Sequence, residues 1–244
     1  MPANPLSEQI EVDDAVLART RLGLHQLAEQ ALASDRFRHD GRIGLRPCPG
    51  GFGTPWVIVD GAKRCSRIEG TEIVLIVGDD RTAAPITTVR AAAELLGVEP
   101  GPPPSYRSEL PFEPDAALEL DAHAVSVVAD WFAFGADSLE RFMAGHHEIE
   151  GAATGPILWP EHFDLAVTIP GEERGEVVLG VSPGDEVDPE PYAYVAWQGV
   201  ERDDAGVATD SWWNRPWGRA VPATEIGVVD DLVAVFDDGF RRSR

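Results

Sequence analysis

Residues 162–169 read His-Phe-Asp-Leu-Ala-Val-Thr-Ile, and this stretch decides how the second half of the chain folds. Large apolar residues occupy every second position, and polar or small residues stand between them. Because side chains alternate between the two faces of a β-strand, the pattern predicts a strand with one apolar face and one polar face. The polar face would carry His162, Asp164, Ala166 and Thr168.

Two more strands follow along the chain. Residues 177–181 alternate in the same way, and the Ser-Pro-Gly-Asp sequence at 182–185 is typical of a tight turn. Residues 192–197 predict the next strand, and Thr224 is expected to cap a final helix. Strands separated by short turns favour an antiparallel sheet.

The first half of the chain has a similar design. Alternation at residues 42–46 predicts a strand, the Pro/Gly-rich residues 47–55 a turn, and residues 56–59 a second strand. Residues 71–77 predict a buried strand. Helices are expected at residues 13–33, from Thr87 or Thr88 to Gly97, and from Asp121 to about Gly145. The fold class is therefore α+β, with antiparallel β-sheet hairpins and packed helices, in two halves whose likeness reflects either a duplication or common turn chemistry.

The domain organisation follows from length and composition. A chain of 244 residues with 43% apolar content can bury a sizeable core, so residues 1–244 are expected to form a single α+β domain. The sequence Glu-Pro-Gly-Pro-Pro-Pro at 99–104 cannot form helix or central strand. A subdivision near residues 98–117 is the alternative.

The charge of the chain excludes some partners. There are 42 acidic and 20 basic residues, which gives a formal net charge of −22. Such a field repels nucleic acids and anionic membrane surfaces, so neither is an expected partner. The N-terminal sequence has no export signal and no apolar run is long enough to cross a bilayer, which favours a cytoplasmic location. Cys48 and Cys65 are then expected to be free thiols.

One candidate site lies on the polar strand face. His162 and Asp164 are two residues apart, as are Tyr192 and Tyr194, so each pair would point to one side of its strand. Imidazole exchanges protons near neutral pH, a carboxylate orients it, and a phenol donates to a developing oxyanion. These four residues are the candidate catalytic set for acid–base or metal-assisted chemistry on a small polar substrate. The alternative is that the acid and the imidazole simply pair while the tyrosines cover a hydrophobic edge.

A divalent metal is the candidate cofactor. Carboxylates and imidazoles are common metal ligands, and the turn between the two later strands adds two acids. The candidate metal ligands are His162, Asp164, Asp185 and Glu186. The sequence leaves open whether a metal is bound and whether the protein is an enzyme.

A basic segment suggests a noncatalytic alternative. Between Arg36 and Arg67 there are seven basic and two acidic residues. Arg42 and Arg46 would share a strand face with Gly44 between them, and such a pair can hold a phosphate or carboxylate. Internal neutralisation of the acidic second half explains the same segment without a ligand.

Tryptophans provide a third hypothesis. Trp212, Trp213 and Trp217 fall within six residues, which indicates either a sheet edge, a pocket wall or a patch for a protein partner. Trp159 and Trp212 complete the candidate ligand-binding residues.

Two further signals are weaker. His146, His147 and Glu148 look like part of a metal site, although histidines at a helix end usually interact with the helix dipole. Cys48 lies in the basic segment, which would lower its pKa and favour a nucleophilic thiolate.

Several of these motifs also resemble those of known sequences. The stretches at 41–46, 49–55, 158–166, 182–185 and 189–194 resemble a group of uncharacterised bacterial proteins, and the second-half motifs are similar to those of a domain-of-unknown-function family. The resemblance implies one soluble unit of constant length. It carries no activity that can be transferred to these residues.

Overall fold

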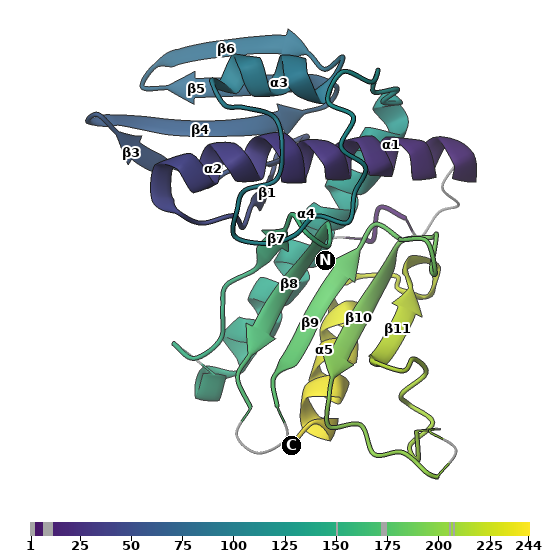
Figure 1. Ribbon diagram of the computed structural model, residues 1–244. Helices are drawn as coiled ribbons and strands as arrows, with labels where there is room; N and C mark the ends of the chain where they lie inside the picture. The colour runs from purple at the N-terminus through teal and green to yellow at the C-terminus, as the bar shows by residue number, and fades with distance from the viewer. Residues whose placement is uncertain (1–2, 7–11, 150, 172–174, 205, 207) are drawn as a thin grey trace. The chain divides into compact units, whose positions relative to one another are not determined.

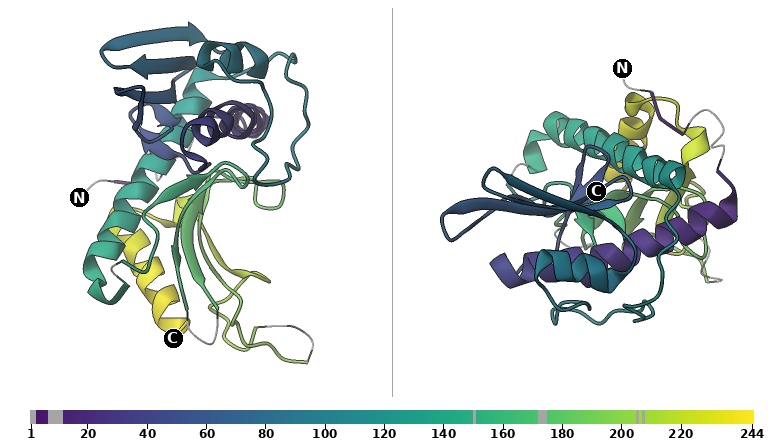
Figure 2. Two further views of the ribbon diagram at one scale, coloured as in Figure 1. Left: turned by 60° about the vertical axis from the view of Figure 1, so that its left-hand side comes forward. Right: turned by 90° about the horizontal axis from the view of Figure 1, so that it is seen from above.

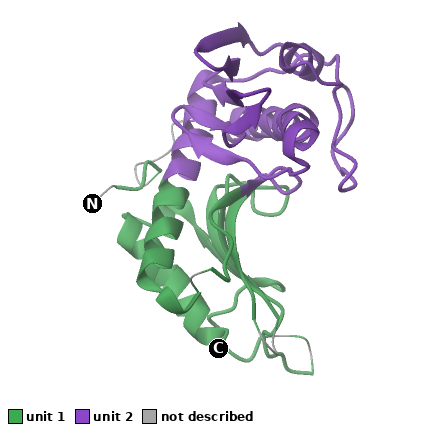
Figure 3. Ribbon diagram, turned by 90° about the vertical axis from the view of Figure 1, so that its left-hand side faces the viewer, with its two compact units in different colours: residues 1–10, 134–157, 164–244 green, residues 11–133, 158–163 purple. Residues whose placement is uncertain are grey.

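The chain forms two compact units. The structure, a computed structural model, describes residues 3–6, 12–149, 151–171, 175–204, 206 and 208–244. Unit 1 comprises residues 1–10, 134–157 and 164–244, and unit 2 comprises residues 11–133 and 158–163 (Figure 3). The division falls inside helix α4 (Ala122–Gly145). The proline-rich region at 98–117, where the sequence suggests a subdivision, lies within unit 2.

Unit 2 begins with one continuous helical stretch. Helix α1 (Asp14–Leu27) runs through the π-helical segment η1 (Ala28–Leu32) into α2 (Ala33–Asp40) (Figure 1). Asp13 caps its start by accepting hydrogen bonds from the Ala15 and Val16 amides, as the sequence predicts. Gly41 ends it in the left-handed conformation.

The sheet of unit 2 is antiparallel. Its strand order is β1-β2-β4-β5-β6, with β3 paired to β4. The helical stretch and α3 lie on one side of these strands (Figure 2). The elements are β1 (Arg46–Cys48), β2 (Gly51–Gly53), β3 (Val57–Val59), β4 (Ala62–Glu69), β5 (Glu72–Val77), β6 (Asp80–Pro85) and α3 (Val89–Leu96).

Two buried groups stabilise unit 2. The rings of Phe52, Phe132 and Phe163 pack edge to face with centroids 5.3–6.3 Å apart. Arg64 makes two hydrogen bonds of 2.8 and 2.9 Å to the buried Asp35 carboxylate, which also accepts one from the Ser66 hydroxyl at 2.6 Å. Each charge of this buried pair is therefore compensated.

The N-terminal strand of unit 2 differs from the prediction. The strand expected at 42–46 begins only at Arg46, and the region expected to be a turn contains the β1–β2 hairpin. Pro47 is accepted in β1 because this strand lies at the edge of the sheet, where a missing amide proton breaks no ladder. Arg42 is outside any strand, so the two arginines do not share a strand face.

Unit 1 contains four strands of a five-stranded sheet of order β11-β10-β9-β8-β7, and the boundary between the units falls within β7, after Ile157. Helix α5 and the second part of α4 lie on one side of it (Figure 2). Gly239 of α5 allows a close approach to β10, since a Cβ at that position would be 2.6 Å from Val195 Cγ2. The elements are β7 (Ile157–Trp159), β8 (Asp164–Ile169), β9 (Val177–Ser182), β10 (Tyr192–Trp197), β11 (Gly218–Pro222) and α5 (Val229–Arg242), with short 3-10 turns η2 (His147–Ile149) and η3 (Ala223–Glu225).

Two boundaries in unit 1 differ from the prediction. The strand expected from His162 begins at Asp164, because residues 161–163 form a turn in which Phe163 has a left-handed φ of 52°. The final helix begins at Val229 instead of after Thr224. Its start is capped by Asp231, whose Oδ2 accepts from the amides of Gly227 and Val228 at 3.0 Å.

The two units together confirm the α+β class, with two antiparallel sheets and packed helices. Throughout the described ranges, no helix combines the length and apolar character that a membrane span requires.

Candidate functional site

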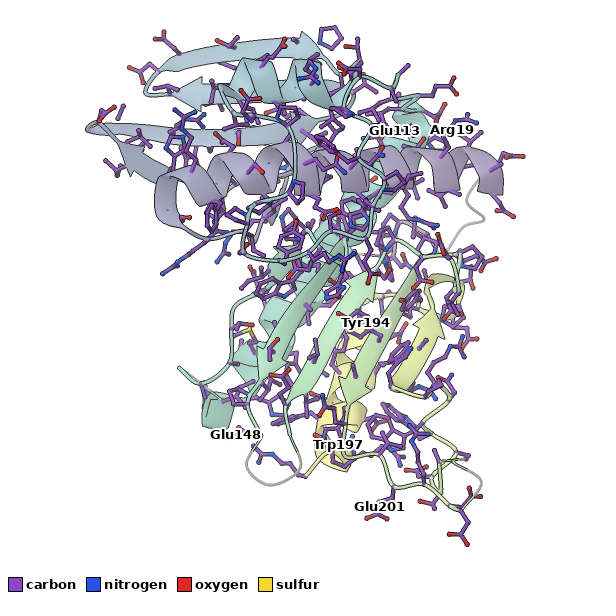
Figure 4. The ribbon with its side chains drawn as sticks, viewed as in Figure 1. Arg19, Glu113, Glu148, Tyr194, Trp197 and Glu201 are labelled. Carbon is purple, nitrogen blue, oxygen red and sulfur yellow. The ribbon has the colours of Figure 1, made fainter. Side chains whose placement is uncertain are left out.

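The face of the unit 1 sheet opposite Val195 and α5 carries two tyrosines. Tyr194 on β10 pairs with Gly180 on β9, and Gly180 pairs with Ala166 on β8. The Tyr194 ring lies against Gly180, where a Cβ would be 2.6 Å from the ring Cζ. The phenol thereby spans the middle strand and donates a hydrogen bond to Oδ2 of Asp164, the first residue of β8 (Figure 4).

A second pair lies beside the first. The Tyr192 phenol donates to Oδ2 of Asp185 at 2.7 Å, and the two tyrosine rings are 6.2 Å apart. The other oxygen of Asp185 accepts from the amides of Val187 and Asp188 at 2.7 and 2.8 Å, which orders the loop after β9. We call Tyr192, Tyr194, Asp164 and Asp185 the phenol–carboxylate row.

Both phenols of the row are neutral. Burial raises the pKa of Tyr194, which is 8% exposed, and the neighbouring Asp164 raises it further. Burial and the hydrogen bond to Asp185 raise the pKa of Tyr192. Each phenol already donates its proton to a carboxylate. The phenol oxygens can therefore accept hydrogen bonds, but they have no free proton to donate to an oxyanion, which is the role that the sequence suggests.

A cavity of about 200 Å³ adjoins Tyr192. Its charged wall is an ion pair, in which Arg215 Nε and Nη2 donate to Asp188 at 3.0 and 2.5 Å. In the turn before β11, the exposed Trp217 meets the Tyr194 ring edge to face with centroids 6.0 Å apart. The cavity is lined by Asp188, Pro189, Glu190, Pro191, Tyr192, Arg215, Ala220 and Pro222.

The other candidate acid–base and metal residues are placed as follows. His162 is exposed in the turn before β8 and belongs to unit 2, whereas Asp164 belongs to unit 1. Glu186 is exposed in the loop after β9. No three His, Cys, Asp or Glu side chains in the described part of the chain converge to hold a metal ion, so the structure supplies no geometry for the expected divalent cation. A joint role of His162 and Asp164 stays a prediction.

The basic segment of unit 2 forms an arginine cluster, consisting of Arg36, Arg42 and Arg46. Burial lowers the pKa of Arg36, the nearby Asp40 raises it, and the charges of Arg42 and Arg46 lower it further, so both cations lie within electrostatic reach of Arg36. Arg36 Nε is buried and 3.5 Å from Asp40 Oδ2, without hydrogen-bond geometry. Arg36 was not predicted to take part, since it lies on α2 and the sequence pattern points to the following strand.

The three clustered tryptophans do not form one surface. Trp213 is buried beside Trp197, with ring centroids 5.6 Å apart. Trp212 lies between the guanidinium groups of Arg219 and Arg242, 4.8 and 5.2 Å from its ring centroid. Trp217 is the exposed member, which leaves a single indole for the predicted partner patch. Trp159 is half-buried at the end of β7.

The weaker signals also have structural explanations. His146 Nε2 lies 2.8 Å from Asp237 Oδ1 and its Nδ1 lies 3.0 Å from Glu148 Oε1, so the residue joins α4 to α5. Cys48 and Cys65 are free, as expected. Burial raises the pKa of Cys48 to about 11, which is opposite to the predicted direction and removes the case for a thiolate nucleophile.

No protein-family model, no curated protein and no solved structure matches the chain.

Proposed function

We propose that unit 1 binds a small molecule with a flat apolar body and N–H donor groups. The observation that carries the proposal is the cavity of about 200 Å³ that lies directly beside the phenol–carboxylate row. Prolines and the Tyr192 ring line the cavity and suit a planar apolar body. The phenol and carboxylate oxygens at its side are hydrogen-bond acceptors.

The charge around the cavity favours a neutral or cationic ligand. Two acids, Asp188 and Glu190, line it, and the guanidinium of Arg215, its one lining cation, is already engaged by Asp188. An anionic ligand would meet net negative charge and lose affinity.

A binding role fits these groups better than catalysis. A general base needs a free lone pair of suitable basicity, and an oxyanion stabiliser needs an unengaged donor. In the row, the phenols are neutral and their protons are bound to Asp164 and Asp185. We therefore place the protein among noncatalytic small-molecule binders.

The test compares three ligands with the same ring. Benzamide has N–H donors, methyl benzoate has none, and benzoate is an anion. A ligand that binds only the folded state raises its melting temperature. We expect benzamide to raise it most and benzoate least.

The matched variants are Tyr192→Phe in unit 1 and Tyr106→Phe in unit 2, which make the same chemical change. Tyr192→Phe should reduce the benzamide effect and Tyr106→Phe should leave it intact. Equal shifts with benzoate, or a benzamide shift that Tyr192→Phe leaves unchanged, would refute the proposal.

The arginine cluster supports a second candidate function, the binding of a small anion by unit 2. The observation that favours it is the gathering of Arg36, Arg42 and Arg46 with Asp40 as the acid beside Arg36. Guanidinium groups bind phosphate through paired N–H donors. Such a ligand would relieve the repulsion among the three cations.

Inorganic phosphate is the probe for this site, with sodium chloride at equal ionic strength as the control for screening. We expect phosphate to raise the melting temperature more than chloride does, and the double variant Arg42→Ala, Arg46→Ala to remove the difference. Arg19→Ala on α1, an exposed residue paired with Glu119, should retain it. A difference that survives the double variant would exclude this site.

A further inference from the structure

Glu29 is a buried acid that neither candidate site uses. It lies on the π-helical segment η1, and its side chain is 1% exposed. Both carboxyl oxygens are buried, and no hydrogen bond of regular geometry reaches either of them from the described residues, although the Tyr106 and Ser108 hydroxyls are close. Burial of a polar group without a partner is costly, and π-helical segments occur frequently at functional sites. This carboxyl therefore needs an explanation beyond packing.

Several other buried polar atoms in unit 2 share this property, and two of them belong to residues that act on the Glu29 carboxyl. The Tyr106 hydroxyl and Glu161 Oε2 also lack hydrogen-bond partners within the described ranges. Burial raises the pKa of Tyr106, and Glu29 and Glu161 both raise it further, so the phenol lies beside both carboxyls. We call Glu29, Tyr106 and Glu161 the acid–phenol cluster.

The three members come from separate parts of unit 2. Glu29 is on the helix, Tyr106 is on the coil at 97–121, and Glu161 is in the turn before β8. Figure 1 shows the coil running alongside the helical stretch of α1 and η1. Their convergence is thus a product of tertiary folding.

The cluster has more acceptors than donors. Two carboxyl groups and a phenol oxygen supply the acceptors, and the phenol proton and the neighbouring Ser108 hydroxyl are the donors. No third His, Cys, Asp or Glu joins them in the described structure to complete a metal site. The complementary ligand is a cation that carries several N–H donors.

The coil over Glu29 is bound to the helical stretch at points on both sides of Tyr106. The Gly101 amide donates to the Gln30 carbonyl at 2.8 Å, and Gln30 Nε2 donates to the Pro111 carbonyl at 3.1 Å. Residues 102–110 form the span between these points and carry both Tyr106 and Ser108.

We propose that Glu29, Glu161 and Tyr106 bind a primary ammonium or guanidinium group, which enters when residues 102–110 move away from the helix. In the bound state, its N–H groups donate to the two carboxylates and to the phenol oxygen. The positive charge compensates the two acids, which a buried site requires. This site is in unit 2 and is independent of the one proposed in unit 1.

Binding of the cation releases a proton. Burial raises the pKa of Glu29, the Ser108 and Tyr106 hydroxyls lower it, and Glu161 raises it, and the net result is a pKa above the ordinary value. His25, one turn earlier on α1, stays neutral because burial lowers its pKa to about 4. The O–H bond of Glu29 breaks on binding, and the proton passes to the solvent. The affinity for the cation should therefore increase as pH rises above about 4.3, the ordinary pKa of glutamate.

The experiment measures melting temperature against the concentration of methylammonium chloride at constant ionic strength. Tetramethylammonium has the same charge and no N–H donor, and calcium chloride tests for a metal site. We expect methylammonium to stabilise the protein, with a larger effect at the higher pH, and neither tetramethylammonium nor calcium to do so beyond the effect of ionic strength.

Three variants locate the effect. Glu29→Gln keeps the shape of the protonated acid and should weaken methylammonium binding about tenfold or more, and Tyr106→Phe should weaken it less. Glu113→Gln makes the same substitution at an exposed site on the coil and should leave binding unchanged (Figure 4). An equal response to the two ammonium ions, a response to calcium, or full binding by Glu29→Gln would overturn the proposal.

Discussion

Single residues control the geometry of the candidate site in unit 1. Tyr194 can reach Asp164 across β9 because Gly180 has no side chain in its way. Glycine within a strand commonly marks a place where another group approaches closely. Gly180 was not predicted as a site residue, although a glycine inside an apolar strand is the signal that would have found it.

Gly180→Ala tests this contact. The added Cβ would be 2.6 Å from the Tyr194 ring, so the ring must move away from Asp164. We expect the free energy of unfolding to fall by about 1–3 kcal/mol, as for an overpacked core. Urea denaturation measures the change. The control is Gly145→Ala, where an added Cβ meets nothing within 4 Å, and its free energy of unfolding should fall by far less. Equal losses of stability in the two variants would contradict the interpretation.

His146 makes the stability of unit 1 depend on pH. Burial lowers its pKa, but the hydrogen bonds to Asp237 and Glu148 outweigh burial and raise it. A folded-state pKa above the unfolded value means that the protonated form stabilises the fold. This contribution is complete below the unfolded pKa of about 6.5 and is lost as pH rises through the folded pKa.

The comparison is between the wild type and His146→Gln, by urea denaturation at about pH 6 and about pH 8. We expect the wild type to exceed the variant in stability by a larger margin at the lower pH. A margin that grows with pH would show that the two carboxylates do not hold the imidazolium.

Among the secondary-structure elements, the helices begin where local capping groups allow, and of the predicted N-termini of α1, α3 and α5, two agree with the structure. The N-caps of α1 and α3, Asp13 and Thr88, agree with the prediction because a cap interacts only with the next two or three residues. Helix α5 departs from it, since its start at Val229 is capped from inside the helix by Asp231. A serine or threonine ahead of an apolar run was the misleading signal.

Asp231→Ala checks this assignment. The substitution removes the acceptor of the Gly227 and Val228 amides, so we expect a loss of about 1 kcal/mol in the free energy of unfolding. Thr224→Ala is the control, because Thr224 lies in η3 ahead of the helix. A greater loss from Thr224→Ala would restore the sequence-based boundary. Thermal or urea unfolding provides the measurement.

For the whole molecule, the net charge is expected to have a large effect on stability. A formal net charge of −22 destabilises a folded chain through self-repulsion, and salt screens that repulsion. We expect the melting temperature to rise when sodium chloride increases from about 10 mM to about 100 mM, over which the Debye length shrinks from about 30 Å to about 10 Å. A falling melting temperature would mean that surface ion pairs, such as Arg90 with Asp115, contribute more than the net charge.

The sequence by itself determined the α+β class and most of the elements, including strand β10 at Tyr192–Trp197. These features depend on periodicity and on caps, which are properties of adjacent residues. It also indicated Tyr192, Tyr194, Asp164 and Asp185 as candidate site residues. It did not indicate which atoms of these side chains form hydrogen bonds.

Only the tertiary structure decided the contacts that give the sites their chemistry. It joined each tyrosine to a carboxylate, added Arg36 to the two predicted arginines, and brought Tyr106 and Glu161 to Glu29. The members of each group are distant in the chain, and no local pattern records which distant side chains will meet. The physical reason is that such contacts follow from strand order and helix packing, which are settled by the burial of the whole apolar surface.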